Sequence, residues 1–357
     1  MSLMDRIRSA SKIKIASTLE EADILTNADC VQTPIPALNI AFTGSINGGL
    51  TPGLTMFCGE SKCFKSLFAL ICAKAYLDKY EDGVLLFYDA EGGASRQYFD
   101  ALNIDMKRVW YSAIKNVEEL KFDIMTQLEQ FERGDHVVIV VDSVGQLASK
   151  KEIEDALDEK AVADMSRAKS MKSLTRMIVP HLNIKNIPMI VINHVYKEIG
   201  LFPRDIPGGG SGWVYGSNQI FIITRSQEKN GTDIVGWNFT LSVMKSRCLK
   251  EKQKFPVTVT YDGGICKWSA LLDIAIDGGF VHKPSNGWYQ RVDSDGVIED
   301  KKWRAKDTNS NKFWQPIIAN PKFDEFVQKK YLLTTTDTQL ISDEPVETEE
   351  EPVETEE

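Results

Sequence analysis

The sequence has few cysteines and histidines and no long apolar run. No apolar run approaches the roughly 20 residues that a transmembrane helix requires. The basic amino-terminal stretch also lacks the continuous apolar core of a signal peptide. The six cysteines form no Cys-x-x-Cys pair and the four histidines are scattered, so we expect reduced thiols and no structural zinc site. These absences favour a cytoplasmic protein with no membrane partner.

Basic residues are missing from the carboxyl-terminal end of the chain. Residues 337–357 contain ten acidic side chains and no Lys or Arg, and they end in two copies of EPVETEE. The rest of the chain holds 42 basic and 41 acidic residues, so its charge does not argue against a polyanionic partner. A segment rich in Pro and Glu cannot bury a core, and we expect 336–357 to be disordered. It serves either solubility or, as a mimic of nucleic acid, competition for a basic surface.

Short apolar runs that alternate with helical stretches indicate an α/β fold. Runs rich in β-branched residues predict strands at 54–60, 83–93, 136–145 and 187–194. Helices are predicted between them at 65–80, 117–133 and 152–184. This alternation is typical of a mainly parallel central sheet covered by helices. After a glycine-rich segment, paired strands are predicted at 219–226 and 236–247, with a turn at 229–231.

These patterns divide the chain into four expected parts. A short amino-terminal segment, 1–32, contains a helix with Leu3, Ile7 and Ala10 on one face. The main α/β domain is expected at 33–264, a small α+β domain with a hairpin turn at 293–296 follows at 265–335, and the acidic tail occupies 336–357.

The segment GESKCFKS, residues 59–66, resembles a phosphate-binding loop of the pattern G-x-x-x-x-G-K-[ST], except that Phe64 replaces the second glycine. Such a loop binds phosphate through its backbone N–H groups, and Phe keeps the N–H that Gly would supply. We expect Phe64 to have right-handed helical dihedrals, because a positive φ would cost about 1–3 kcal/mol. The alternative is an ordinary turn that happens to contain Lys-Ser. The residues predicted to surround the nucleotide are Gly59, Glu60, Ser61, Lys62, Cys63, Phe64, Lys65 and Ser66.

Three residues of this loop have an expected part in binding a nucleoside triphosphate. Gly59 makes the turn off the strand, Lys65 reaches the β- and γ-phosphates, and Ser66 ligates Mg²⁺. The cofactors predicted by this motif are therefore ATP and Mg²⁺.

Three further strand ends carry polar side chains. Asp142 ends the run HVVIVVD, Glu91 follows LLFYDA, and His194 ends IVINH. Ends of parallel strands line the ligand crevice of such sheets. Asp142 is predicted to contribute a carboxylate to the second coordination shell of Mg²⁺, Glu91 to activate a water, and His194 to sense the γ-phosphate. The alternatives are a helix-capping Asp, a solvated Glu and a structural His.

Two basic segments complete the candidate set. Lys245 and Arg247 lie two residues apart on an apparent strand, so both should point to one face. They belong either to a solvated face or to a phosphate site, in a neighbouring subunit if the chain assembles. The glycine-rich segment 195–212 can follow a phosphate backbone or merely connect two strands. Its candidate DNA-binding residues are Lys197, Phe202, Arg204, Gly208, Gly209 and Gly210.

These motifs together resemble the RecA-type recombinases, and most closely the UvsX recombinases of T-even-like phages. FTGSINGGLTPG, GESKCFKS, FYDAEGG, VVDSVGQLASKKEIEDAL, IPMIVINH and VMKSR occur in the order of that family, from about residue 30 to 335. The phage branch also resembles this chain in placing Phe at the second loop glycine. His194 stands where bacterial members have Gln, and Arg247 stands where they have Lys.

The resemblance implies a RecA-like P-loop ATPase that forms a helical filament on single-stranded DNA and exchanges strands with homologous double-stranded DNA, in recombination, repair and recombination-dependent replication. It implies that Lys65, Ser66, Asp142 and Glu91 carry ATP hydrolysis. Lys245 and Arg247 would complete the ATP site of a neighbouring protomer, on which residues 1–32 would dock.

The same resemblance places two DNA-binding loops. The first is near 149–167, with Arg167 as a candidate contact, and the second is the segment 195–212. Phage relatives imply a mediator and a single-strand-binding protein as partners, and host-cell cytoplasm as the location. Two other functions stay open: a hexameric helicase motor on the same core, and a scaffold that binds ATP without hydrolysing it.

Overall fold

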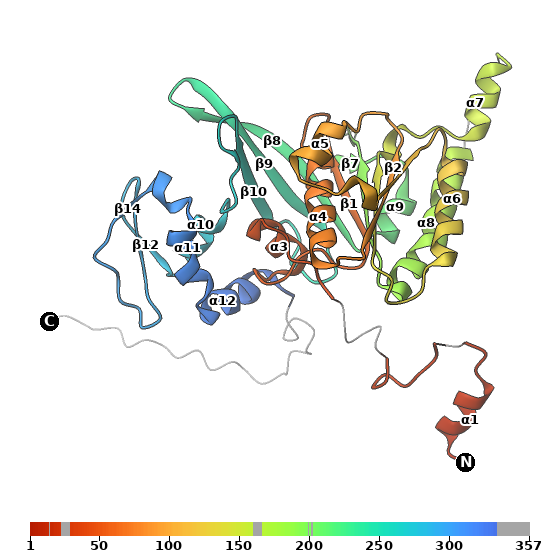
Figure 1. Ribbon diagram of the computed structural model, residues 1–357, viewed down its shortest axis with the longest axis horizontal. Helices are drawn as coiled ribbons and strands as arrows, with labels where there is room; N and C mark the ends of the chain where they lie inside the picture. Colours follow the sequence, from red (N-terminus) through yellow and green to blue (C-terminus); the bar gives the residue numbers. More distant parts are fainter. Residues whose placement is uncertain (14, 23–28, 160–165, 199, 201–202, 334–357) are drawn as a thin grey trace.

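A nine-stranded sheet runs through the computed structural model of the chain (Figure 1). The structure describes residues 1–13, 15–22, 29–159, 166–198, 200 and 203–333. The strand order is β11-β10-β9-β8-β1-β5-β4-β2-β3. The pairs from β3 to β8 are parallel, and those from β8 to β11 are antiparallel. The predicted mainly parallel sheet and the predicted strand pair that follows it are confirmed.

The strand bounds follow the apolar runs of the sequence closely. The parallel strands are β1 (Gly53–Gly59), β2 (Val84–Asp89), β3 (Val109–Ala113), β4 (Val137–Asp142) and β5 (Pro188–Asn193). The mixed part contains β8 (Gln219–Asn230), β9 (Asp233–Lys245), β10 (Lys254–Thr260) and β11 (Gly264–Ile265). The edge strand β3 was not predicted, because its exposed aromatic residues break the apolar pattern.

Helices cover both faces of the sheet, and side chains that alternate along each strand divide between two cores. Phe57 of β1 belongs to the core beneath α4, whereas Met56 and Cys58 belong to the core beneath α8. The first face carries α3 (Pro36–Thr43), α4 (Lys65–Lys79) and α5 (Arg96–Ala101). The other carries α6 (Val117–Gln130), α8 (Ser166–Lys185) and α9 (Ser211–Gly216).

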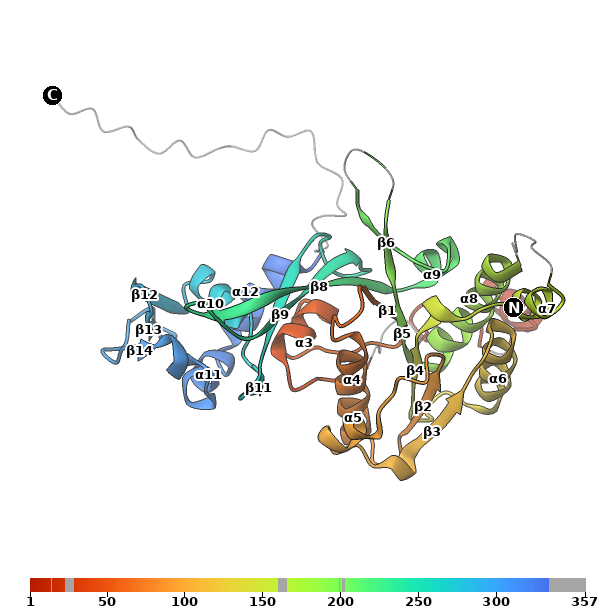
Figure 2. The same cartoon turned by 90° about the horizontal axis from the view of Figure 1, so that it is seen from above.

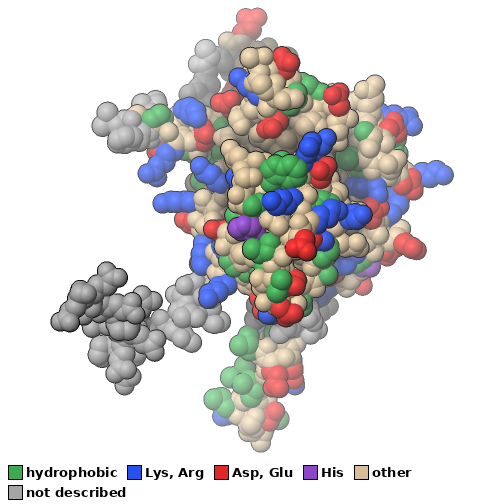
Figure 3. Space-filling model, turned by 90° about the vertical axis from the view of Figure 1, so that its left-hand side faces the viewer, with side chains coloured by type: hydrophobic (Ala, Val, Ile, Leu, Met, Phe, Trp, Pro, Cys, Tyr) green, Lys and Arg blue, Asp and Glu red, His purple; other side chains and the backbone are tan. Residues whose placement is uncertain are grey.

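The carboxyl-terminal part forms a small α+β unit beside β10 (Figure 1). Its three-stranded sheet consists of β12 (Val281–Ser285), β13 (Trp288–Arg291) and β14 (Trp303–Arg304). Its helices are α10 (Leu271–Asp277), α11 (Asn311–Ile318) and α12 (Pro321–Tyr331). Asp324 of α12 accepts hydrogen bonds from Ser45 and from the backbone N–H of Ile46, which ties this unit to the main domain. Figure 3 views the molecule from the left-hand side of Figure 1, and on this face Lys and Arg side chains are interspersed with acidic ones.

Two exposed elements project from the sheet and its helices. Residues 152–184 were predicted to be mostly helical, and the structure has α7 (Lys150–Leu157) and α8 in this part of the chain. Between β5 and α9, β6 (Val195–Lys197) and β7 (Asp205–Pro207) form a hairpin that projects away from the sheet (Figure 2). These two elements occupy the segments predicted to be the DNA-binding loops.

The amino-terminal helix α1 (Leu3–Ala10) has the capping box expected of a helix start, formed by Ser2 and Asp5. It buries none of its residues, and Leu3, Met4 and Ile7 are all more than half exposed. The acidic tail lies outside the described residues, so its predicted disorder is not tested. Within the described part of the chain, no helix is long and apolar enough to cross a membrane.

Candidate nucleotide-binding site

The loop between β1 and α4 contains a backbone conformation that we did not expect. Phe64 immediately precedes α4 with φ 64° and ψ 12°, in the left-handed region, so the expectation of right-handed dihedrals was wrong. Its ring stacks on Phe239 of β9, with the ring centroids 4.7 Å apart, and meets Phe68 edge-on at 5.2 Å. Aromatic packing thus offsets a strain of about 1–2 kcal/mol. The backbone keeps the shape that a glycine would allow.

Replacing Phe64 with Gly should therefore destabilise the protein, although it removes the strain. The loss of two aromatic contacts and of half-buried apolar surface exceeds the relief, and we expect a net loss of about 1–3 kcal/mol in the free energy of unfolding. Urea denaturation of the two proteins measures this difference. A variant more stable than the wild type would show that strain outweighs packing.

Gly59 is required for a reason other than the turn that we predicted. Its φ is not positive, but a Cβ atom there would lie 2.5 Å from the carbonyl oxygen of Ile223 on β8. Gly59 pairs with Ile223 in the parallel ladder. The glycine therefore lets the loop leave the sheet in close contact with β8.

Lys65 is buried at the start of α4 and points back into the loop. Its Nζ donates to the carbonyl oxygens of Gly59 at 3.0 Å and Glu60 at 2.7 Å. Burial lowers the pKa of this ammonium group from its ordinary value, although the nearby Cys63, Asp142 and Glu91 act to raise it. An anion that entered the loop would offer this cation a stronger partner than the two carbonyl groups do.

Ser66, in the first turn of α4, forms a hydrogen bond with Asp142, the last residue of β4. Burial raises the pKa of the Asp142 carboxyl to about 6, a hydrogen bond with Ser66 opposes this, and the charges of Glu91 and Asp89 add to it. A carboxylate and a hydroxyl are oxygen ligands that suit Mg²⁺, which is usually held with the phosphates of its substrate. The described residues contain no group of three or more His, Cys, Asp or Glu that could hold a metal ion alone.

Glu91 and His194 meet at the same edge of the sheet. The Ser143 hydroxyl donates to Oε1 of Glu91 at 2.5 Å, and Nε2 of His194 lies 3.0 Å from the same oxygen. Burial raises the pKa of Glu91, but the hydrogen bonds with Ser143 and His194 outweigh it, so the pKa is lowered overall. Glu91 is therefore an ionised carboxylate near neutral pH, as a general base must be.

Lys65, Ser66, Glu91, Asp142 and His194 line one cavity of about 480 Å³. Its wall includes loop residues 61–67, Glu91, Asp142 and His194. The wall also includes Tyr98 of α5, which is 47% exposed and which we did not predict. An aromatic residue just after the Glu91 loop was the available signal, since a nucleotide base stacks well on such a ring. The donor set and the volume fit a magnesium nucleotide.

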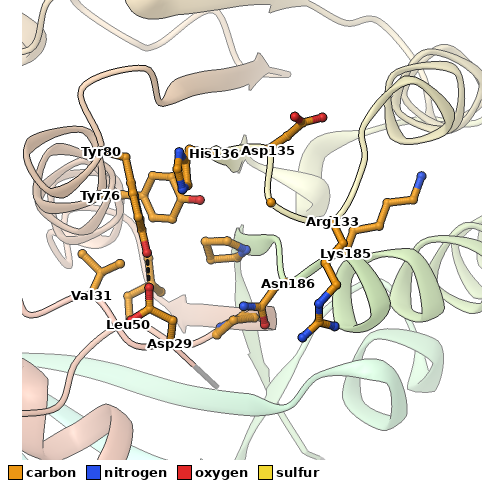
Figure 4. A pocket seen from close by; sticks show the side chains of 13 residues that line it. Asp29, Val31, Leu50, Tyr76, Tyr80, Arg133, Asp135, His136, Lys185 and Asn186 are labelled. Carbon is orange, nitrogen blue, oxygen red and sulfur yellow. Dashed lines mark hydrogen bonds between the residues drawn. The ribbon is translucent and has the colours of Figure 1, made fainter. Parts of the chain in front are cut away.

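A second cavity, of about 330 Å³, lies at the opposite edge of the sheet (Figure 4). There the Tyr80 hydroxyl donates to Asp29, and His136 stacks on the Tyr80 ring with the centroids 3.9 Å apart. Pro52 and His136 directly precede β1 and β4, so this cavity adjoins the amino ends of the strands. Asp29 and Val31, from the segment that leads into the main domain, line this cavity, and none of its lining residues belongs to the loop 59–66.

Lys245 and Arg247 do not share a strand face. β9 ends at Lys245, and Arg247 lies in the bend that follows, so this part of the prediction was wrong. Nζ of Lys245 donates to the carbonyl oxygens of Val214 and Tyr215 in the last turn of α9. Burial, followed by the nearby Arg247 charge, lowers the pKa of Lys245. Within this chain the two cations lie outside the cavity wall.

Some of the candidate DNA-binding side chains contact other groups of the chain, and others are exposed. The Arg167 guanidinium donates to the carbonyl oxygens of Leu147 and Gly145, and Lys197 pairs with Asp205 across the β6–β7 hairpin. Arg204 is exposed at the end of that hairpin. Phe202 lies outside the described residues. Gly208 donates its N–H to the carbonyl oxygen of His194, while Gly209 and Gly210 have φ of 78° and 87° before α9.

Comparison with known proteins identifies the family. The description "RecA N-terminal domain" matches residues 17–266, and "Bacteriophage T4, Recombination and repair protein, C-terminal domain" matches residues 268–327. The chain is 44% identical to the "Recombination and repair protein" of Enterobacteria phage T4 over 350 residues, 97% of this chain and 90% of that protein. It is 29% identical to "Protein RecA" of Staphylococcus epidermidis over 252 residues, 70% of this chain and 67% of that protein. The chain therefore belongs to the RecA family of recombinases and has the predicted RecA-like fold.

Proposed function

We propose that this chain is an ATP-dependent DNA recombinase that forms a helical filament on single-stranded DNA and exchanges strands with a homologous duplex. The main support is that three features line one cavity. They are a phosphate-binding loop, the oxygen ligands of Ser66 and Asp142, which suit Mg²⁺, and the ionised carboxylate of Glu91. Family membership assigns this convergence to recombination and repair. The activity on DNA would take place in the cytoplasm of a host cell.

The residues around the cavity have distinct roles in this function. The loop N–H groups and Lys65 would bind the triphosphate, and the ring of Tyr98 would stack on the base. Ser66 and Asp142 would hold Mg²⁺, which supplies charge neutralisation at the phosphates when bound. Glu91 would accept the proton of the attacking water, because its lowered pKa keeps it ionised.

His194 connects this site to the hairpin proposed to bind DNA. Its side chain contacts Glu91, and its backbone precedes β6 directly. Its carbonyl oxygen accepts from Gly208, whose own carbonyl oxygen accepts from Asn193. A Cβ at Gly145 would lie 2.8 Å from the His194 ring, so a small residue there leaves room for this side chain. A change at the γ-phosphate would therefore reach Lys197, Arg204 and the glycines through His194.

Assembly would involve further residues of a second copy. Lys245 and Arg247 are proposed to complete the nucleotide site of a neighbour, as cations that stabilise charge in the transition state. The unburied apolar side chains of α1 are proposed to dock on that neighbour. A mediator and a single-strand-binding protein are further proposed partners.

The test is an ATPase measurement with and without single-stranded DNA, combined with electron microscopy of the DNA-bound protein. We expect DNA to raise turnover about tenfold or more by ordering the site, and we expect open helical filaments. Closed rings that unwind forked DNA would indicate a helicase motor instead. Nucleotide binding with no phosphate release would indicate a scaffold.

A further inference from the structure

The loop that carries Glu91 is organised by the buried carboxylate of Asp89. Neither the sequence motifs nor the proposed mechanism gives this residue a role. Asp89, the last residue of β2, is only 3% exposed. Its Oδ1 accepts the backbone N–H groups of Glu91 at 3.0 Å and Gly92 at 2.7 Å. Its Oδ2 accepts the N–H of Ala94 at 3.3 Å. One side chain thus satisfies three backbone donors, those of Glu91, Gly92 and Ala94, in a loop that lies outside the sheet.

The other contacts of this loop are made by the Glu91 side chain, with Ser143 and His194, and by Ala94, which packs against the core. Gly92 has a φ of 64°, and a Cβ placed on it would meet nothing within 4 Å. Packing therefore does not fix the backbone at Gly92, whose N–H is held by Asp89. The position of the Glu91 backbone therefore depends on the Asp89 carboxylate.

The fourth hydrogen-bond donor to the Asp89 carboxylate lies on β3, the edge strand of the sheet. The Tyr111 hydroxyl of β3 donates to Oδ2 of Asp89 at 3.0 Å. Tyr111 is 52% exposed and its ring stacks on Phe87. Burial, and then this hydrogen bond to a carboxylate, raises the pKa of the Tyr111 phenol, so the hydroxyl stays protonated and able to donate.

We propose that Asp89 is the positioning residue of Glu91, and that Tyr111 holds Asp89 in place from the exposed edge strand. The inference rests on the proposed function, in which Glu91 acts as the base. Asp89 itself contacts the loop backbone and Tyr111, and it acts on turnover only through Glu91.

The backbone around Asp89 makes this proposal testable by substitution. The carbonyl oxygen of Asp89 accepts from the N–H of Ile114, and Asp89 pairs with Asp142 in the parallel ladder. The strand therefore has main-chain support that does not involve the side chain. Asp89→Ala removes every side-chain acceptor, whereas Asp89→Asn keeps Oδ1, which accepts the two shorter bonds.

The experiment measures ATP turnover of the full chain on single-stranded DNA for Asp89→Ala, Asp89→Asn, Glu91→Gln and the double variant Asp89→Ala/Glu91→Gln. Misplacement of a base costs up to its whole contribution, so Asp89→Ala should lower kcat by about tenfold or more with little change in KM. Asp89→Asn should stay within about threefold of the wild type. The double variant should turn over no more slowly than Glu91→Gln, because the two residues act as one unit.

Tyr111→Phe tests the edge-strand contact, with Tyr88→Phe as its matched control. Tyr88 neighbours Asp89 on β2, and its hydroxyl donates to Asp123 at 2.7 Å, away from the loop. Loss of one hydrogen bond to Asp89 should lower kcat about two- to fivefold in Tyr111→Phe, and Tyr88→Phe should leave it unchanged. Amide exchange of Glu91, Gly92 and Ala94 should be faster in Asp89→Ala than in the wild type.

The measurements separate failure of this inference from failure of the function on which it rests. A kcat of wild-type size in Asp89→Ala, beside an inactive Glu91→Gln, would overturn the inference alone. A further large loss in the double variant would also overturn it, because Asp89 would then act independently of Glu91. Turnover that survives Glu91→Gln would overturn the proposed base, whereas faster amide exchange in Asp89→Ala would still establish that Asp89 orders the loop.

Discussion

Glu91→Gln should lower the rate of ATP turnover about 10²- to 10⁴-fold, the usual contribution of a general base. Glutamine has nearly the same shape and can keep a hydrogen bond with Ser143 or His194, but it cannot accept a proton near neutral pH. The affinity for ATP should remain similar, because Glu91 does not belong to the phosphate loop. A steady-state phosphate-release assay measures turnover, and calorimetry measures affinity.

The matched control for this variant is Glu81→Gln, which makes the same chemical change at an exposed residue before β2. It should behave as the wild type in both measurements. Equal loss of turnover and of affinity in Glu91→Gln would mean that the site had been disrupted. A rate close to that of the wild type would assign the base to another group.

Asp142→Asn should make the nucleotide-free protein more stable, by about 2–3 kcal/mol at pH 8 in the free energy of unfolding. Burial, together with the charges of Glu91 and Asp89, raises the pKa of Asp142 from 3.8 to about 6 in the folded chain. The folded state therefore binds this proton more tightly than the unfolded state, so the wild type loses stability as the pH rises from about 3.8 to about 6. Asparagine removes this cost.

The sign of this effect has a defined pH window. The stability advantage of Asp142→Asn should be full above about pH 6 and should shrink as the pH falls toward the unfolded value of 3.8, where both states bind the proton. Urea denaturation of both proteins in the presence of a chelator, at several pH values, measures the difference. A difference that did not change between pH 4 and pH 8 would exclude Asp142 ionisation as its cause.

The same substitution should abolish magnesium-dependent turnover, since a neutral amide is a weaker ligand for Mg²⁺ than a carboxylate. A protein that gains stability while it loses activity would show that Asp142 is kept charged at a cost to the fold. Such trade-offs are common at functional sites.

The sheet was predictable because its strands are apolar runs, and the site was largely predictable because Lys65, Glu91, Asp142 and His194 follow such runs. The failures have a common physical cause. The φ of Phe64 depends on packing against Phe239, which is remote in sequence. Local pattern also cannot show that the side chains of β3 remain exposed at the edge of a sheet.

The hydrogen bonds of Asp89 were invisible for a similar reason, because an Asp at the end of a strand has no unique partner in the sequence. The end of β9 is a smaller failure of the same kind. Alternation predicted one face for Lys245 and Arg247, but the chain bends directly after Lys245. Where tertiary contacts decide a conformation, residue types alone do not determine it.

The stacking of Phe64 on Phe239 has a mechanical consequence. A glycine at position 64 would let the loop move without disturbing β9. The phenyl ring of Phe64 instead holds the loop in contact with β9. Any rearrangement of the loop when an anion enters must therefore slide or tilt this ring against β9, the same strand that carries Lys245 at its far end. This ring contact would couple the opening of the loop to the orientation of the Lys245 side chain, so that the two move together rather than independently.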